Sequence, residues 1–406
     1  MKTIAFTDNG LAGHKLAYMC YHIKIGADLG HTILCVVPEA EKIQRWITVN
    51  HPDLLNKIIF YSFPKEEIEI VEKAGQFSQF MSKIKLWQRF NSILKRAEKQ
   101  HHIKIDLVFF NWLDSLLTNN LHPVFIDFIF RYKWAGIYFH PQVLRFHPEL
   151  LKEKTSFSHV DIGLTSKNCI AVGLHDEGII EGQSFRINNK KVLLFPEIAD
   201  DTPPNFQDKI YTEIKQKAKN RTIVGILGVE PFKGSAEFMR MAQKMDASKY
   251  FFALTGPYEE FYLDYFPSKT IGNEFKEFIT NPPENVYVNL GLLKEGEEYN
   301  SVFAAFDIVF IIYKEFPSAS NRLTKAAHLN RLVITDEKYC VGEDVRKYNL
   351  GAAVNGNDLD AIEKGITHLR ERIIKNDFPA EEWKIYAAKN SIAVLKDRFN
   401  EIIGFL

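Results

Sequence analysis

The feature that most constrains the fold is a regular alternation of apolar runs and helical patterns between Asn285 and Thr335. A β-branched and aromatic run at 286–289 precedes a helical pattern at 299–306 and a continuous apolar run at 307–313. A polar loop, a second helical segment and the apolar run 332–335 follow. Apolar runs without polar alternation are typical of strands buried on both faces. The order therefore predicts a parallel sheet with right-handed crossovers.

The polar loop at 315–321 is expected at the carboxyl ends of these strands, the edge at which open parallel sheets bind ligands. It reads Glu-Phe-Pro-Ser-Ala-Ser-Asn and leads into a helix. Free N–H groups at that helix start, with Ser318, Ser320 and Asn321 as candidate caps, would suit an anion such as a phosphate. An ordinary capped helix is the alternative that the loop by itself leaves open.

Composition narrows the class of protein. The chain of 406 residues carries 51 basic and 51 acidic side chains, so no global attraction to nucleic acid is expected. This length favours two domains over a single core. The four cysteines lack Cys-x-x-Cys spacing, which indicates neither a zinc site nor a disulfide framework. The first residues read as a strand that Asp8 interrupts, unlike a signal peptide, and no apolar run reaches transmembrane length. We expect a cytoplasmic protein.

The first half opens with a βαβ pattern, in which a strand at 3–7 and a helix at 15–29 flank a glycine-containing loop. Gly10 and Gly13 in that loop, next to His14, would let a ligand approach the backbone closely. A plain tight turn is the alternative. The G-x-G-x-x-G fingerprint is absent, which argues against a nicotinamide enzyme.

Polar residues follow later strands of this half. Asn111 comes after the apolar run 106–110, and His140 ends the run 134–139, so both are candidate ligand contacts. Further strands are predicted at 161–165 and 191–195, with a polar, glycine-rich loop or hairpin between them.

A long amphipathic helix is predicted at 80–99. Its apolar stripe includes Trp87 and Phe90, and its polar face carries six basic residues against the single acid Glu98. Such a helix can lie on an anionic membrane surface, which would place the protein peripherally on the inner membrane face. The alternative is a helix packed on the core with a solvated basic face.

A proline-rich stretch at 196–205 separates the two strand–helix series and is the best candidate for a linker. We predict Rossmann-like domains at 1–195 and 206–378, and a terminal helix at 379–406 that could return to the first domain. The second domain starts with a strand at 222–227 and a loop that ends in Lys233-Gly234 at a helix start. One cation beside helix N–H groups would suit a diphosphate.

The order of features in the second half resembles the nucleotide-binding domain of retaining GT-B glycosyltransferases, in particular family 4. The matching features are a glycine loop that ends in Lys-Gly, a Thr-Gly turn, an Asn-Val run, a tyrosine-containing helix before an Asp-led strand, an acidic loop before a helix, and a strand that ends in threonine. Here they are Gly228 with Lys233-Gly234, Leu254-Thr-Gly256, Asn285-Val286 with Gly291, Tyr299 to Asp307, Glu315 to Ala327 and Val333-Ile-Thr335. The first half is similar to the family's acceptor domain at Gly10, Gly13, Gly30-His31, Asp106-Leu-Val and His140.

The resemblance implies an α/β fold of the GT-B type, with two Rossmann-like domains whose parallel sheets face each other across a cleft. It implies a metal-independent, retaining hexosyltransferase that uses a nucleoside-diphosphate sugar, requires no cofactor, and acts on a glycan, lipid-linked or protein acceptor. The implied catalytic residues are His140 and Glu315. The implied donor-binding residues are Gly13, Gly228, Lys233, Gly234, Gly256, Ser318, Ser320, Asn321, Arg322, Leu323 and Lys325, and the acceptor-side residues are Gly10, His14 and Asn111.

The chain departs from the family pattern at several positions. Val229 follows Gly228 where the family has a basic residue, and Pro317 stands eight residues before Lys325, where the family has the first of two glutamates. Lys325 stands where the family has the second of two glutamates, which holds the nucleotide ribose. A glutamate accepts hydrogen bonds from ribose hydroxyls, whereas a lysine can only donate. Two alternatives therefore stay open: a GT-B-shaped protein that binds a ligand or partner without turnover, and a sugar-nucleotide epimerase of the same architecture.

Overall fold

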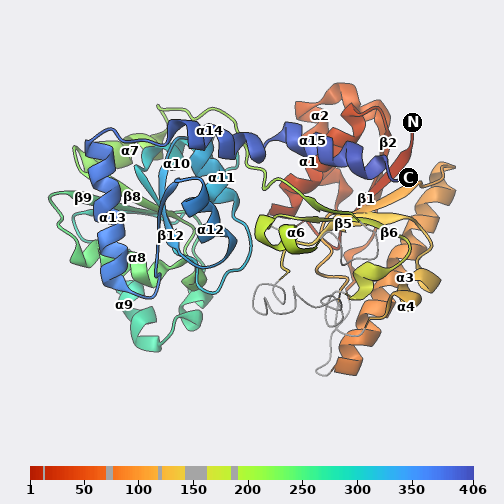
Figure 1. Cartoon of the computed structure of the whole chain (residues 1–406), viewed down its shortest axis with the longest axis horizontal. Helices are drawn as coiled ribbons and strands as arrows, with labels where there is room; N and C mark the ends of the chain where they lie inside the picture. Colours follow the sequence, from red (N-terminus) through yellow and green to blue (C-terminus); the bar gives the residue numbers. More distant parts are fainter. Residues whose placement is uncertain (12–13, 70–75, 118–120, 142–161, 184–190) are drawn as a thin grey trace. The chain divides into compact units, whose positions relative to one another are not determined.

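The computed structural model describes residues 1–11, 14–69, 76–117, 121–141, 162–183 and 191–406. The chain forms two compact units (Figure 1). One comprises Met1–Pro196 together with Ile392–Leu406, and the other comprises Glu197–Ser391. Each unit has its own parallel sheet with helices on both faces, so the predicted pair of Rossmann-like domains is confirmed.

The described part of the N-terminal unit forms a seven-stranded parallel sheet in the order β3-β2-β1-β4-β5-β6-β7. The strand order reverses between β1 and β4, so the switch point that favours ligand binding lies at their carboxyl ends. The strands are β1 (Thr3–Thr7), β2 (Thr32–Val37), β3 (Ile58–Ser62), β4 (Leu107–Phe110), β5 (Trp134–Ile137), β6 (Cys169–Leu174) and β7 (Lys191–Leu194). The helices are α1 (His14–Asp28), α2 (Ala40–Asn50), η1 (Pro52–Lys57), η2 (Lys65–Glu67), α3 (Gln76–His101), α4 (Pro123–Ile129), η4 (Ile162–Thr165), α6 (Glu177–Gln183) and α15 (Ile392–Ile403).

The described part of the C-terminal unit forms a six-stranded parallel sheet in the order β10-β9-β8-β11-β12-β13, with its switch point between β8 and β11. The strands are β8 (Thr222–Leu227), β9 (Tyr250–Thr255), β10 (Val286–Asn289), β11 (Ile308–Ile311), β12 (Leu332–Asp336) and β13 (Gly351–Val354). The helices are α7 (Lys209–Ala218), η5 (Pro231–Lys233), α8 (Ser235–Lys244), η6 (Glu260–Tyr265), α9 (Lys269–Thr280), α10 (Glu297–Ala305), α11 (Asn321–His328), α12 (Tyr339–Lys347), α13 (Leu359–Ile374) and α14 (Ala380–Lys389).

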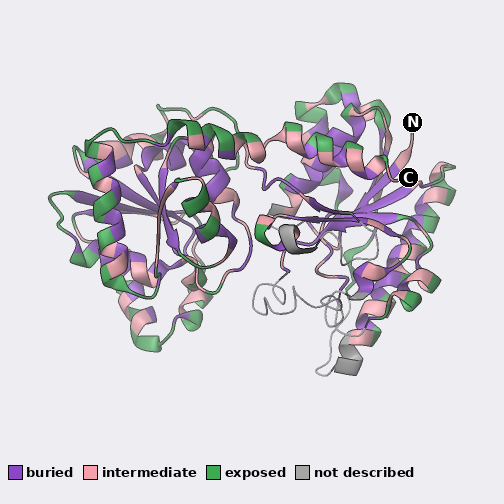
Figure 2. Cartoon of the chain, in the orientation of Figure 1, coloured by how far each residue is buried: buried purple, intermediate pink, exposed green. Residues whose placement is uncertain are grey.

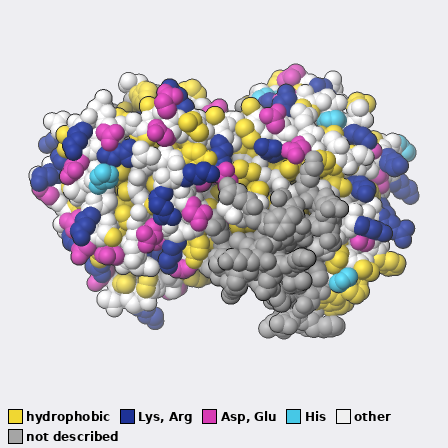
Figure 3. Space-filling model, in the orientation of Figure 1, with side chains coloured by type: hydrophobic (Ala, Val, Ile, Leu, Met, Phe, Trp, Pro, Cys, Tyr) yellow, Lys and Arg dark blue, Asp and Glu magenta, His cyan; other side chains and the backbone are white. Residues whose placement is uncertain are grey.

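Buried residues follow the strands of both sheets (Figure 2). All six residues of β8 are buried, as expected of a strand covered on both faces. The surface differs: basic and acidic side chains are interspersed over the visible face of the C-terminal unit (Figure 3). Polar side chains thus lie mainly in loops and at strand ends, where backbone N–H and C=O groups are not hydrogen-bonded within the sheet.

The C-terminal segment does not form the single helix predicted at 379–406. It forms α14, which belongs to the C-terminal unit, and α15, which belongs to the N-terminal unit. Phe399 of α15 is fully buried, and its ring lies 4.8 Å from that of Phe109 on β4 and 5.6 Å from that of Phe6 on β1. Burial of such a side chain contributes about 1.5–3 kcal/mol, which explains why the last helix packs on this sheet.

The strand predicted at 161–165 is wrong. Residues Ile162–Thr165 form the short helix η4, and the strand follows it as β6. The carboxylate of Asp127 accepts hydrogen bonds from the Ser166 hydroxyl at 2.5 Å and from the Lys167 amide at 3.2 Å. This contact, made from distant α4, holds a turn ahead of the strand. Helix α6 likewise occupies part of the region that the sequence predicted as a loop or hairpin.

Helix α3 confirms the helix predicted at 80–99, and its apolar stripe packs into the core. Trp87 and Leu94 are fully buried, and the Trp87 ring lies 5.2 Å from that of Trp134 on β5. This stripe therefore cannot also insert into a membrane. Across the described ranges, no helix has both the length and the hydropathy needed to cross a bilayer.

Candidate functional site

The loop after β8 lies at the switch point of the C-terminal sheet and contains two residues in the left-handed region. Gly228 has φ 72° and Gly234 has φ 78°. A Cβ on Gly234 would lie only 2.4 Å from the Ile312 carbonyl oxygen, so glycine is required for the loop to pass the end of β11. Gly256, with φ 99°, follows β9, and a Cβ on it would lie 2.7 Å from the Gly228 nitrogen. Three glycines thus let two loops pack closely at this edge.

Two cations flank Gly228. An ideal Cβ on this residue would lie 3.1 Å from Lys233 Nζ and 3.3 Å from Arg322 Nη2. Lys233 comes from η5 and pairs with Glu230, whereas Arg322 comes from the first turn of α11. The loop after β8 and the helix after β11 therefore bring two positive charges and one negative charge to the same point. The net positive charge suits an anionic ligand.

Both cations are partly buried. Burial, followed by repulsion from Arg322, lowers the pKa of Lys233 to about 8, and the contact with Glu230 opposes this shift. Nη1 of Arg322 is buried and has no hydrogen-bond partner among the described residues. A buried guanidinium nitrogen without an acceptor is costly, so this atom is an unsatisfied donor next to the Gly228 loop.

The loop between β11 and α11 supplies hydroxyl groups beside these cations. Ser320 occupies the N-cap position of α11 without a side-chain capping bond, and its hydroxyl lies 3.1 Å from the Tyr313 hydroxyl. The Ser318 hydroxyl is buried without a partner among the described residues. Leu323 is a core residue whose amide already bonds to the Ser320 carbonyl oxygen, and Asn321 begins the helix.

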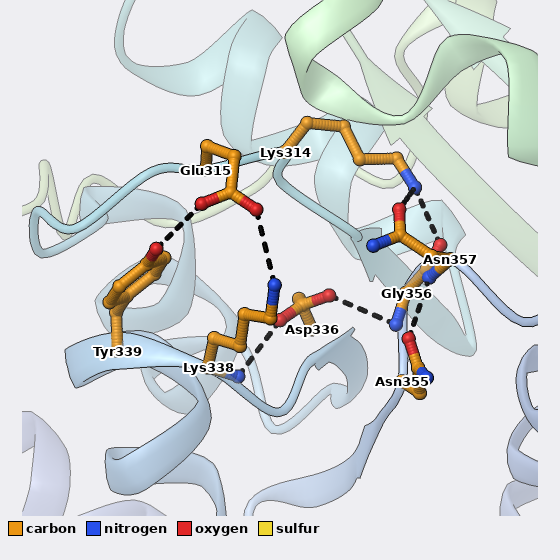
Figure 4. A network of polar contacts seen from close by, with 8 residues as sticks. All are labelled: Lys314, Glu315, Asp336, Lys338, Tyr339, Asn355, Gly356 and Asn357. Carbon is orange, nitrogen blue, oxygen red and sulfur yellow. Dashed lines mark hydrogen bonds and ion pairs between the residues drawn. The ribbon is translucent and has the colours of Figure 1, made fainter. Parts of the chain in front are cut away.

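Glu315 belongs to a polar network that links the loops after β11, β12 and β13 (Figure 4). Its carboxylate accepts from the Tyr339 hydroxyl at 2.7 Å and from Lys338 Nζ at 3.1 Å, and these contacts lower its pKa. Asp336 accepts from the Gly356 amide at 2.9 Å, and Lys314 Nζ donates to the Gly356 carbonyl oxygen at 2.6 Å. The exposed Glu315 is thus ionised and oriented.

Lys325 is committed to contacts inside the unit. Its side chain is 3% exposed, and Nζ donates to Asn300 Oδ1 at 2.5 Å and lies 3.9 Å from Glu295 Oε2. The ammonium also lies 4.5 Å from the ring centroid of Tyr299. Burial lowers the pKa of Lys325, and nearby acids oppose this shift. The Asn300 amide in turn donates to the Thr202 carbonyl oxygen at 2.7 Å. Lys325 therefore anchors α10, and Asn300 of that helix holds the segment at Thr202, where the chain enters the C-terminal unit.

In the N-terminal unit, the predicted acceptor-side residues differ in burial: Gly10 is partly buried and Asn111 fully buried. The Gly10 amide lies 3.3 Å from Asp8 Oδ1 at the end of β1. Asn111 is fully buried, with Oδ1 2.5 Å from His22 Nδ1 and its amide 3.4 Å from the Lys15 carbonyl oxygen, so it joins β4 to α1. Gly13 lies outside the described residues, as does the side chain of His14.

His140, which follows β5, is oriented by the carboxylate of Asp114 from the segment after β4. Asp114 accepts from the His140 amide at 2.8 Å and lies 3.1 Å from its Nδ1. The Trp112 ring stacks on Phe139 with centroids 3.8 Å apart and planes 11° apart. An aromatic surface next to an oriented imidazole can contact the apolar face of a sugar ring.

Sequence reasoning missed a buried acid in the same unit. Burial raises the pKa of Asp8 to about 6 against the opposing charge of Lys15, whose Nζ lies 2.8 Å away. Oδ2 of Asp8 is buried without a hydrogen-bond partner among the described residues. Its position directly after a strand at the switch point was the available signal, but the sequence alone could not show its burial.

Structural comparison defines the class of fold. HepE from Anabaena, solved with UDP and glucose, superposes with a TM-score of 0.64 at 15% identity over 100% of both chains. The trehalose-6-phosphate synthase OtsA gives 0.65 at 12% identity over 99% of this chain and 98% of that one. Sucrose-phosphate synthase from Thermosynechococcus elongatus gives 0.63 at 12% identity over 99% and 98%. No family model and no curated protein sequence matches the chain. The chain has the GT-B fold, as predicted.

Proposed function

We propose that this chain is a glycosyltransferase that moves a sugar from a nucleoside-diphosphate sugar to a glycan, lipid-linked or protein acceptor. The observation that carries the proposal is the pair of cations, Lys233 and Arg322, that flank Gly228 at the switch point of the C-terminal sheet. A leaving nucleoside diphosphate gains negative charge as the glycosidic bond breaks, and fixed cations stabilise that charge. The fold shared with HepE, solved with UDP and glucose, supports this assignment.

The proposed roles follow from position. Lys233 and Arg322 would bind the diphosphate, with Gly228, Gly234, Gly256, Ser318, Ser320 and Asn321 around it. Glu315 would accept from sugar hydroxyls, and His140, oriented by Asp114, is the catalytic residue that we propose in the N-terminal unit. Since Lys325 is committed to Asn300, we propose that it supports the site through α10 and does not bind ribose directly. We further propose a retaining mechanism, as the resemblance to family 4 implies. We also propose that the reaction needs no bound metal, because the two cations supply the charge that a metal would otherwise provide.

Incubation with radiolabelled sugar nucleotides tests the function. Release of the nucleoside diphosphate together with label in an acceptor from cell extract is the expected result, and it should persist in EDTA. The anomeric configuration of the product, measured by NMR, tests retention. Interconversion of the sugar nucleotide without an acceptor would instead identify an epimerase. Binding without either reaction would identify a protein that does not turn over.

The pKa of Lys233 predicts a pH dependence. The ammonium is charged below about pH 8 and neutral above it, so kcat/KM should fall as the pH rises through about 8. Lys233→Arg keeps its charge throughout this range and should lose the alkaline limb while retaining part of the activity. A wild-type profile that stays flat to pH 9.5, roughly one and a half units above that pKa, would contradict the prediction.

Association with a membrane remains a proposal that rests on the basic face of α3, because its apolar stripe is buried. The exposed lysines of this face are Lys85, Lys95 and Lys99. We expect electrostatic binding to anionic vesicles that disappears at high salt and in the triple Lys→Glu variant. Co-sedimentation measures this binding. Equal recovery with neutral and anionic vesicles would refute the proposal.

A further inference from the structure

A cavity lies in the C-terminal unit at the edge of the sheet opposite the Gly228 loop. Asp307 and Arg331 line it, and they immediately precede β11 and β12, so it lies at the amino-terminal ends of these parallel strands. Its volume is about 480 Å³, within the range of small-molecule sites. None of the residues that line it belongs to the site described above. Its remaining lining comes from the residues just after α11, from the end of α13, from Phe378 and from the first part of α14.

The guanidinium of Arg331 has no directly paired carboxylate in this cavity. It makes no hydrogen bond or ion pair to any described residue, and its Nε is buried. Burial lowers its pKa, and the charge of Asp307 opposes this shift. The other charges are paired: Asp307 lies 3.5 Å from Lys215 and accepts from the Ile223 amide, while Lys384 lies 2.7 Å from Glu381. One carboxylate, Asp307, is therefore shared by Lys215 and Arg331, which leaves net positive charge at the cavity.

The cavity also has an apolar wall with one unsatisfied donor. Trp383 is only 3% exposed, and its indole Nε1–H has no acceptor among the described residues. Its ring lies 5.8 Å from that of Phe378, and Ile373 and Leu329 complete the wall. Buried donors are almost always paired in folded proteins, so two unpaired donors at one cavity require an explanation.

We propose that this cavity binds a small organic anion with a ring-bearing apolar body, whose carboxylate or phosphate pairs with Arg331. The planar guanidinium matches either group with two parallel hydrogen bonds. The indole and phenyl rings cover the apolar body. Because the cavity lies at the opposite edge of the sheet, its ligand does not compete with a nucleoside diphosphate at Gly228. This assignment does not depend on the proposed transferase activity.

NMR of the full ¹⁵N-labelled chain tests the proposal through the indole N–H signals. The Trp383→Phe variant assigns the signal, and the probes are phenylacetate, phenyl phosphate and the neutral benzyl alcohol. We expect one or both anions to shift the Trp383 signal with a dissociation constant of about 1 mM or lower, and benzyl alcohol to bind at least about tenfold more weakly. The two anions distinguish a carboxylate ligand from a phosphorylated one. Saturating UDP should leave these affinities unchanged.

Arg331→Met should weaken anion binding about tenfold or more while keeping the melting temperature, since the guanidinium has no partner to lose. The matched control is Arg240→Met, which removes an arginine of the same unit that pairs with Glu274 and lies outside the cavity. The proposal is overturned if neither anion binds at about 10 mM, if benzyl alcohol binds equally well, or if UDP displaces the anions. Unchanged binding in Arg331→Met would also overturn it. The comparison of probes on the wild-type chain decides the matter even if that variant does not fold.

Discussion

Lys233→Met should lower kcat for sugar transfer about a hundredfold and leave the fold intact. Loss of one preorganised electrostatic contact to charge that develops in the transition state typically has an effect of this size. The side chain lies in the loop at the switch point, beside Arg322 and Gly228, where the leaving diphosphate would gain charge. Steady-state kinetics with the identified donor measure the change, and the melting temperature monitors the fold.

Lys217→Met is the control for that variant. Lys217 lies on the exposed face of α7 in the same unit, and its ammonium stands 5.1 Å from the Tyr287 ring centroid. The substitution removes one positive charge, as Lys233→Met does, but lies outside the candidate site, so kcat should remain within about twofold of wild type. Full activity in both variants would place the diphosphate elsewhere in the unit.

Gly228→Ala should reduce kcat/KM on the order of tenfold to a hundredfold. The added Cβ would lie 3.1 Å from Lys233 Nζ and 3.3 Å from Arg322 Nη2, closer than such contacts normally are. Both are ends of flexible side chains, so they move at little cost in stability, but they move away from the ligand. Misplacement of positioning groups by about 1 Å can cost a hundredfold in rate.

Gly30→Ala separates this effect from backbone strain. Gly30 has φ 81°, similar to the φ 72° of Gly228, but no atom of the described chain lies within 4 Å of an ideal Cβ there. Each variant should lose about 1–2 kcal/mol of unfolding free energy from the left-handed conformation. Only Gly228→Ala should lose activity, measured as initial rates beside thermal melts. Equal activity of the two variants would show that the Gly228 loop does not position the cations for catalysis.

A likeness of fold alone does not establish an activity, since one architecture supports many chemistries. We therefore infer transfer from Lys233 and Arg322, and the variants above test these residues directly. Lys325 illustrates the distinction. The sequence placed it where the resemblance implies a ribose contact, whereas the structure shows its ammonium bonded to Asn300. Activity in the presence of this lysine would show that ribose can be held by another group.

The sequence by itself determined most of the elements and the sheet edge at which the candidate C-terminal site lies. Apolar runs such as 307–313 and loop glycines such as that of Lys233-Gly234 are local signals. A parallel strand that is buried on both faces is apolar along its length, so it can be predicted without knowledge of its neighbouring strands. The same signals failed at 161–165, because a carboxylate on distant α4 stabilises a turn there. The assignment of the last helix to the first sheet was likewise decided by the ring of Phe399.

Only the tertiary structure decided which side chains meet. Lys233 and Arg322 belong to different strand–helix units of the sequence and come together because β8 and β11 are neighbours in the sheet. Burial then lowers the pKa of Lys233 and raises that of Asp8, and it leaves Arg331 Nε without a hydrogen-bond partner among the described residues. Sequence periodicity records which face of an element is apolar. It does not record which charged side chain from a distant part of the sequence lies nearby, because strand order and loop packing determine which side chains meet.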